Sequence, residues 1–252
     1  MLSVIIPVYN GGAGLKALWT RLEPVMKALG CPWEVVFVDD GSTDGSIEQI
    51  KGICTTEPSS AWVRLAENRG QQAAVLCGFR HCSGDWAVTI DDDLQHPPEF
   101  IPALYSEAEE GRFDAVYAVP GNGSGKAGGL IRDGFFSILL GKPAGMKIGS
   151  FRILSRAAVD LICAADGRFV YISAELFSGA LRIGSIRYPA EPQAALPAQP
   201  SRYGTSGRLI LYLKLFLWYT PVIRRLTRLL TEGPGIVSGC RQYRVADKGG
   251  FK

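Results

Sequence analysis

The 252-residue sequence lacks the features that mark several large classes of protein. Its six cysteines form no Cys-x-x-Cys pair and no zinc-finger spacing, which favours a reduced, cytosolic chain. The longest apolar stretch, Leu209–Ile223, has 15 residues and contains Lys214, whereas a membrane-spanning helix needs about 18–20 residues. The 27 Lys and Arg exceed the 24 Asp and Glu by a net charge of only +3, which argues against a protein that binds polyanions over its whole surface.

The N-terminal segment Met1–Pro7 has neither the basic region nor the small-residue cleavage site of a signal peptide, so we expect it to form a first strand. A content of 47% hydrophobic and 20% charged residues, with a mean hydropathy of +0.10, excludes the disordered and fibrous classes. The length allows one large or two small domains. The sequence therefore predicts a globular chain without a transmembrane span.

Short β-branched runs alternate with amphipathic segments through the first 120 residues. We expect strands at 3–8, 34–38, 62–65, 86–90 and 115–119, and helices near 15–29, 46–54, 71–82 and 99–109. This alternation predicts an α/β fold with a mostly parallel central sheet flanked by helices. Further strands are expected at 150–154 and near 183–188. Because ligands of such sheets bind at the carboxyl ends of the strands, the polar residues that follow the strands are candidate site residues.

The composition changes after the fifth strand. Residues 121–129 are rich in glycine and predict a mobile lid, and residues 189–200 contain four prolines, which indicates a boundary. No acidic residue lies between Glu191 and Glu232, while six basic residues surround the apolar 209–223 stretch. This predicts an amphipathic helix in a membrane interface, with Trp218 and Tyr219 at headgroup depth. We expect a main domain at 1–190, a Pro-rich connection with this helix at 191–230, and a flexible tail at 231–252.

Three consecutive aspartates, Asp91, Asp92 and Asp93, follow the fourth strand. Adjacent carboxylates repel one another, so a divalent cation is an economical explanation, and Mg²⁺ or Mn²⁺ takes such oxygen ligands. Strand alternation puts Asp91 and Asp93 on one side and Asp92 on the other, and Gln95 can turn back with a neutral oxygen. An acidic turn that caps the helix after 97–98 explains the same residues equally well.

The segment from Asp39 to Asp44 follows the second strand. Its carboxylates can accept hydrogen bonds from a nucleobase or from ribose hydroxyls. A tight turn in which Ser42 or Thr43 caps the next helix is the simpler explanation for this segment taken alone. Residues 67–70 (Glu-Asn-Arg-Gly) end the third strand and are either a nucleotide contact or a helix cap.

Taken together and in order, these segments resemble family 2 glycosyltransferases of the GT-A fold, a Rossmann-like nucleotide-diphospho-sugar transferase fold. The resemblance rests on 4–10 (Val-Ile-Ile-Pro-Val-Tyr-Asn), 38–44 (Val-Asp-Asp-Gly-Ser-Thr-Asp), 67–70 and 91–98 (Asp-Asp-Asp-Leu-Gln-His-Pro-Pro). The last segment is similar to the branch of dolichyl-phosphate mannose synthase and the bacterial polyprenyl-phosphate glycosyltransferases. Segments 149–156 and 202–206 are similar to two further elements of that branch.

The resemblance implies roles for individual residues. The metal-binding positions, for Mg²⁺ or Mn²⁺ on the diphosphate of a nucleotide sugar, are matched by Asp91, Asp93 and Gln95. Positions around the nucleotide are matched by Pro7, Tyr9, Asn10, Asp39, Asp40 and Asp92. Basic positions near the phosphates are matched by Arg132, Arg152 and Arg202, the last one residue away from the family's usual arginine. Catalytic positions are matched by Asp93, Arg152 and Glu175, although Glu175 is equally explained as a surface carboxylate of a helix.

The resemblance further implies inverting transfer of a sugar to a polyprenyl phosphate, on the cytoplasmic face of the membrane, in the synthesis of cell-envelope glycans. A phosphate acceptor is already ionised at neutral pH and relaxes the need for a general base. This matters because residues 144–148 contain no acid where the family usually has one. Two alternatives stay open: a soluble or glycan acceptor with Glu175 as the base, and a catalytically weak nucleotide-sugar-binding subunit. Peripheral membrane contact is expected, nucleic acid is not, and a homo-oligomer or a membrane partner subunit is possible.

Overall fold

A computed structural model of the chain describes residues 1–121, 137, 141–143, 145–165, 170–189, 219 and 243–250. The predicted lid, apart from Gly121, and the predicted interface helix, apart from Tyr219, lie outside these residues. So do Arg132 and Arg202, whose roles stay predictions. Among the helices that the structure does describe, none is both long enough and apolar enough to cross a bilayer.

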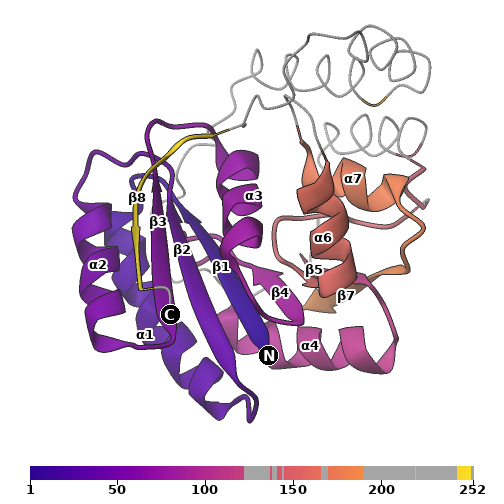
Figure 1. The fold of residues 1–252 in the computed structure, drawn as a ribbon. Coiled ribbons are helices and arrows are strands. Elements are labelled where there is room, and N and C mark those ends of the chain that lie inside the picture. The colour runs from indigo at the N-terminus through magenta and orange to yellow at the C-terminus, as the bar shows by residue number, and fades with distance from the viewer. Residues whose placement is uncertain are drawn as a thin grey trace, which may run out of the picture.

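The described part of the chain forms one eight-stranded sheet in the order β7-β5-β6-β4-β1-β2-β3-β8 (Figure 1). Its strands are β1 Leu2–Val8, β2 Trp33–Asp39, β3 Ser60–Leu65, β4 Trp86–Thr89, β5 Ala115–Pro120, β6 Arg152–Ser155, β7 Ile183–Tyr188 and β8 Val245–Gly249. Strand β1 is parallel to β2 and β4, β2 to β3, and β5 to β7. Strand β6 runs antiparallel to β4 and β5, and β8 runs antiparallel to β3. The predicted α/β fold with a mostly parallel sheet is confirmed.

Helices cover both faces of the sheet because its strands alternate apolar side chains between two cores. The helices are α1 Gly12–Ala28, α2 Ser46–Thr56, α3 Gln71–His81, α4 Ile101–Glu110, α6 Arg156–Ala164 and α7 Ile172–Ser178, with a 3-10 turn η1 at Pro98–Phe100. Ile5 packs into the core under α3, α6 and α7, whereas Val4 and Ile6 pack into the core under α1, α2 and α4. Helix α3 lies directly on β1 because Gly78 faces Ile5, where any Cβ would clash.

The antiparallel strand β6 brings its first residues to the edge of the sheet where the parallel strands end. Arg152, the first residue of β6, is paired with Thr89 at the end of β4 and with Tyr117 of β5. The loops that follow β1, β2 and β4 lie at this same edge, because those three strands are parallel neighbours. The fold therefore gathers the polar segments singled out in the sequence at one edge.

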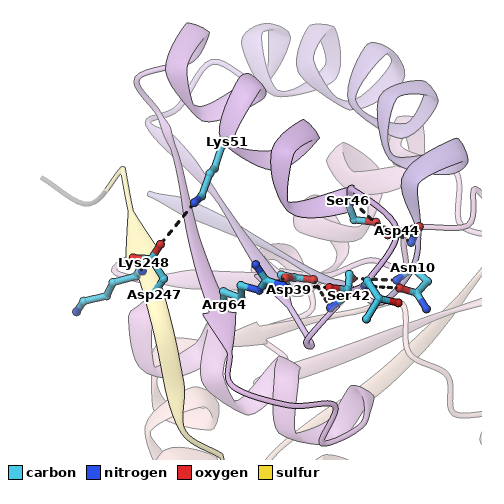
Figure 2. Close-up of polar contacts among 11 residues, drawn as sticks. Asn10, Asp39, Ser42, Asp44, Ser46, Lys51, Arg64, Asp247 and Lys248 are labelled. Carbon is cyan, nitrogen blue, oxygen red and sulfur yellow. Dashed lines mark hydrogen bonds and ion pairs between the residues drawn. The ribbon is translucent and has the colours of Figure 1, made fainter.

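Strand β8 differs from the expectation of a flexible C-terminal tail. Residues 245–249 pair with β3, next to an irregularity in register between Arg64 and Leu65. The buried ring of Tyr243 lies under the guanidinium of Arg80, which also donates a 3.4 Å hydrogen bond to the Tyr243 hydroxyl. Lys51 of α2 lies 3.5 Å from Asp247 of β8 (Figure 2). For residues 245–249, the prediction of a flexible tail is wrong.

Candidate active site

The loops after β1 and β2 are joined by hydrogen bonds between backbone and side chains (Figure 2). The Asn10 backbone N–H donates to Ser42 Oγ at 3.0 Å, and the Thr43 N–H donates to Asn10 Oδ1 at 2.9 Å. The Gly11 N–H donates to Ser46 Oγ at 3.1 Å. Asn10 has a φ of 51°, a left-handed conformation that asparagine tolerates better than most residues. These contacts hold the two loops in one arrangement.

Asp39 at the end of β2 and Asp40 directly after it are buried and bonded to the chain itself. Asp39 is fully buried; its Oδ1 accepts the Ser42 N–H at 3.0 Å, and its Oδ2 lies 3.2 Å from Arg64 Nε (Figure 2). Asp40 accepts the backbone N–H groups of Arg69 at 2.7 Å and Gly70 at 2.8 Å, where α3 begins. The observed contacts of both carboxylates are those of loop-holding residues, and their contact with a nucleoside stays a prediction.

Asp44, rather than Ser42 or Thr43, bonds to the start of α2. Its Oδ1 accepts the Ser46 N–H at 3.1 Å and the Ser46 hydroxyl, and its Oδ2 accepts the Gly12 N–H at 3.2 Å. Partial burial by itself raises the pKa of Asp44, but these hydrogen bonds outweigh it and the pKa is lowered below its ordinary value. The predicted cap by Ser42 or Thr43 is wrong because Ser42 bonds to Asn10 instead.

The two remaining nucleotide candidates lie on β1 and just after it. Pro7 is buried within β1, in register with Val38 of β2, and Tyr9 follows the strand as a partly exposed residue. Their position next to the Asn10 loop agrees with the edge that the sequence predicts. Their contact with a nucleotide stays a prediction.

Asp91 joins three segments at the end of β4. Its Oδ1 accepts a hydrogen bond from Gln71 of α3, and its Oδ2 accepts one from Ser150 at 2.7 Å. The Asp91 N–H donates to His96 Nδ1 at 3.3 Å, and the His96 ring stacks on Phe151 with 5.2 Å between ring centroids. Sequence reasoning named neither Gln71 nor Ser150 as a site residue, although both adjoin segments that it had singled out.

The other two aspartates differ in their surroundings, as strand alternation predicts. Asp92 is buried against the first loop, where a Cβ on Gly11 would clash with its carboxylate. Asp93 is more exposed, and its Oδ1 accepts the N–H of Gln95 at 3.1 Å. The Gln95 side chain is exposed. The carboxylate of Asp93 is therefore partly exposed at the surface of the site, whereas the carboxylate of Asp92 is buried.

The carboxylates of Asp91 and Asp93 suit a metal ion that shares its ligands with a substrate. The pKa of Tyr188 is raised, first by burial and then by the negative charges of Asp91 and Asp93. Both carboxylates therefore lie close enough to the Tyr188 hydroxyl to act on it together. In the part of the chain that the structure describes, no three His, Cys, Asp or Glu side chains form a metal centre. Mg²⁺ is commonly held by one or two carboxylates plus substrate phosphates. The donor set thus fits such an ion.

Arg152 is a buried cation with few partners. It is 3% exposed, donates to Ser173 Oγ at 3.2 Å, and lies 5.9 Å from the centre of the Tyr117 ring. The Tyr117 hydroxyl donates to the same Ser173 oxygen at 3.0 Å. Within the described residues Arg152 has no ion pair, and its Nε has no hydrogen-bond partner. A buried, unpaired guanidinium costs stability, which indicates an anionic ligand.

Glu175 of α7 is bonded to a residue that the sequence places far away. Its Oε1 accepts a hydrogen bond from the Tyr219 hydroxyl at 2.6 Å, and the same hydroxyl accepts one from the Tyr171 N–H at 3.0 Å. Tyr219 is only 6% exposed. The predicted location of Tyr219 at headgroup depth is therefore wrong, because its ring is buried in the protein. A catalytic role for Glu175 stays a prediction.

Comparison with known proteins places these features in a family. Residues 3–163 match the sequence model of glycosyl transferase family 2. The undecaprenyl-phosphate 4-deoxy-4-formamido-L-arabinose transferases of Salmonella paratyphi B and Salmonella newport are 35% identical over 184 residues. That alignment covers 70% of this chain and 56% of each relative, so the chain spans little more than half of their length.

Solved structures support the fold. Glucosyl-3-phosphoglycerate synthase from Mycobacterium tuberculosis, in complex with UDP, has a TM-score of 0.63 at 20% identity and covers 85% of this chain and 79% of its own. The same enzyme with Mn²⁺, UDP-glucose and phosphoglyceric acid has a TM-score of 0.61 at 18% identity, with coverages of 86% and 77%. The fold is the GT-A fold of these enzymes, and because the family's sequence model matches more than half of the residues, the chain belongs to glycosyl transferase family 2.

Proposed function

We propose that this chain transfers a sugar from a nucleotide-diphosphate sugar to a polyprenyl phosphate, with inversion, at the cytoplasmic face of the membrane. The relatives at 35% identity are named as undecaprenyl-phosphate transferases, and a structural neighbour binds UDP-glucose with Mn²⁺. The observation that carries the proposal is Arg152, a buried cation without an ion pair among the described residues. It stands at the edge of the sheet where Asp91 also lies.

Arg152 and Asp91 are connected through a short piece of chain. Ser150, two residues before Arg152, donates to Asp91 Oδ2, and Phe151 between them supports His96. A phosphate bound to Arg152 would therefore lie beside a diphosphate held at the aspartates. A guanidinium binds phosphate through paired, charge-assisted hydrogen bonds, which would give the orphaned Nε an acceptor. This arrangement suits a reaction between two phosphate-bearing substrates.

Asp91 and Asp93 would hold Mg²⁺ or Mn²⁺, with Gln95 as the third predicted ligand. When bound, the metal supplies positive charge against the charge that grows on the leaving diphosphate. Asp91 is held in place by Gln71 and Ser150. Asp93 presents its carboxylate from the following turn, where its Oδ1 accepts the Gln95 N–H.

The surroundings of Glu175 favour a phosphate acceptor over a hydroxyl acceptor. A hydroxyl needs a base to remove its proton, and Glu175 already accepts a hydrogen bond from the Tyr219 hydroxyl at 2.6 Å. A phosphate monoester has a second pKa of about 6 and presents an ionised oxygen at neutral pH without help. The absence of an acid at residues 144–148 is then no obstacle to the reaction.

The test is an acceptor panel. The chain is incubated with Mn²⁺, radiolabelled UDP- and GDP-sugars, and undecaprenyl phosphate in anionic vesicles, with a glycan acceptor in a parallel arm and EDTA as the control. We expect label in the organic phase, release of nucleoside diphosphate, and loss of both with EDTA. Label on the glycan alone would contradict the phosphate acceptor. Nucleotide binding without transfer to either acceptor would indicate a nucleotide-sugar-binding subunit.

A further inference from the structure

The first turn of α7 is held by side chains from other parts of the chain. The Ile172 N–H donates to Gln72 Oε1 of α3 at 3.1 Å, and the Tyr171 N–H donates to the Tyr219 hydroxyl at 3.0 Å. The N-cap residue, Tyr171, makes no capping bond with its own side chain. The first N–H groups of a helix have no partner within the helix and need one from elsewhere. Here tertiary contacts supply it.

The Tyr219 hydroxyl is both a hydrogen-bond acceptor and a hydrogen-bond donor at this turn. It accepts from Tyr171 and donates to Glu175, which lies 44 residues earlier in the sequence. The ring is 6% exposed, and a hydrogen bond to a carboxylate is stronger than one between neutral groups. Tyr219, which the sequence places within the apolar 209–223 stretch, is thus bonded to the first turn of α7.

The same turn carries the residue that orients Arg152. Ser173 Oγ accepts from Arg152 Nη1 at 3.2 Å and from the Tyr117 hydroxyl at 3.0 Å. Helix α7 has seven residues, and helices this short are marginal without tertiary support. The position of Ser173, and with it the direction of the Arg152 guanidinium, therefore depends on the contacts that hold the turn.

We infer that the Tyr219–Glu175 hydrogen bond is a positioning device for the acceptor phosphate: it fixes the first turn of α7, so that Ser173 orients Arg152. The inference rests on the proposed function only for the identity of the acceptor. Tyr219 and Glu175 are positioning residues in this scheme, since neither touches the reacting atoms. Glu175 acts as a hydrogen-bond acceptor for Tyr219 and not as a general base.

The first variant is Tyr219→Phe, which removes the hydroxyl and keeps the ring. The hydroxyl makes two hydrogen bonds, and each is worth up to about tenfold in an equilibrium, so the KM for polyprenyl phosphate should rise by about tenfold or more. The KM for the nucleotide sugar should stay within about twofold, since the aspartates are held by other contacts. Tyr105→Phe is the matched control, because Tyr105 donates to Glu109 at 2.8 Å on the exposed face of α4. Tyr105→Phe should change neither the KM for polyprenyl phosphate nor the KM for the nucleotide sugar.

The second pair of variants separates a positioning role from a base. Glu175→Gln keeps a carbonyl oxygen that accepts a weaker, neutral hydrogen bond from Tyr219, so it should raise the acceptor KM only slightly and leave kcat unchanged. Glu175→Leu removes this bond but not the one between Tyr171 and Tyr219, so it should raise the acceptor KM more than Glu175→Gln and less than Tyr219→Phe. The double variant Tyr219→Phe with Glu175→Leu should be no worse than Tyr219→Phe alone, since loss of the hydroxyl already removes its contact with Glu175. A large fall in kcat for Glu175→Gln would make Glu175 the base and overturn the inference.

A measurement without substrate keeps this inference separate from the proposed function. Amide hydrogen exchange at Tyr171 should be faster in Tyr219→Phe and unchanged in Glu175→Gln and Tyr105→Phe. Wild-type exchange at Tyr171 together with a wild-type acceptor KM in Tyr219→Phe would overturn the inference. Faster exchange in a protein that transfers no sugar to polyprenyl phosphate would uphold the positioning contact and refute the proposed function.

Discussion

Two halves of the candidate site are built on opposite principles. In the proposed donor side, residues 10–12, 39–44 and 91–96, most acidic groups accept hydrogen bonds from N–H and O–H donors of the chain itself. The proposed acceptor side comprises Arg152 with Ser173, Glu175 and Tyr219. Within the described residues, its buried cation contacts one hydroxyl group and an aromatic ring. Most carboxylates of the donor side thus have hydrogen-bond donors within the chain, and the buried Asp39 Oδ2, which accepts no hydrogen bond in the part of the chain that the structure describes, still has an ion pair with Arg64. Arg152 has no such opposite charge among the described residues, and in our proposal the acceptor phosphate supplies it.

The difference has an energetic meaning. Buried carboxylates that accept several N–H bonds can stabilise a fold, whereas a buried guanidinium without an opposite charge costs stability. Proteins keep such costly groups where function requires them. We therefore expect changes on the donor side to reduce catalysis or stability, and changes at Arg152 to reduce function without reducing stability.

The largest effect is expected for Asp93→Asn on the donor side. It removes a negative charge from the proposed metal site, and the rate of sugar transfer should fall by about 10²–10³-fold. The measurement is kcat at saturating Mn²⁺ and nucleotide sugar. Asp160→Asn is the control, because Asp160 is an exposed carboxylate of α6, 3.7 Å from Arg156, outside the site. Transfer by Asp93→Asn at the wild-type rate would remove Asp93 from the metal site.

Arg152→Met tests the acceptor side directly. We expect the KM for polyprenyl phosphate to rise by about 10- to 100-fold, while the free energy of unfolding stays level or increases by about 1 kcal/mol. Urea unfolding alongside steady-state kinetics measures both.

Arg156→Met is the comparison for this change, since Arg156 is an arginine of the neighbouring helix whose donors are engaged. Its Nε donates to the Gly84 carbonyl at 3.0 Å and it lies 3.7 Å from Asp160. Its loss should lower the free energy of unfolding by about 1–3 kcal/mol and leave the acceptor KM unchanged. If Arg152→Met proved as destabilising as Arg156→Met, the acceptor side would not be the unsatisfied half of the site.

The two halves also differ in how far the sequence predicts them. Strands β1 to β7 have β-branched, apolar patterns, and the polar donor-side segments follow them directly, so local pattern and parallel topology suffice to bring them together. The fully buried state of Asp39 was not foreseen, because it depends on Arg64 of the neighbouring strand. Local pattern thus predicts where these residues lie better than it predicts their partners.

The acceptor side and β8 depend on tertiary contacts that leave little local signal. Tyr219 reaches Glu175 across 44 residues, from a stretch whose composition favours a membrane interface. Of the five residues of β8, two are charged (Asp247 and Lys248) and two are small (Ala246 and Gly249), which is a poor pattern for a strand. Its conformation therefore depends on pairing with the edge of β3. Neither feature can be predicted from hydrophobic periodicity or from the spacing of motifs in the sequence.

The smallest effect is expected at Asp44, where the donor side is held by an ionised carboxylate. Because hydrogen bonds from Ser46 and Gly12 lower the pKa of Asp44, its contribution to stability is present above the unfolded-state pKa of about 4 and is lost as the pH falls through the lower folded-state value. Asp44→Ala should lower the free energy of unfolding by about 1 kcal/mol near pH 7.

The difference between wild type and Asp44→Ala should then shrink as the pH falls below about 4, because the wild-type carboxyl becomes protonated and loses acceptor strength. Urea unfolding of both proteins at neutral and acidic pH measures this convergence. Asp160→Ala is the matched control, since this side chain is 67% exposed and should change stability little at either pH. If the difference in the free energy of unfolding between wild type and Asp44→Ala stayed the same in acid, the loop would be held by packing. Charge would then contribute less to the donor side than to the acceptor side.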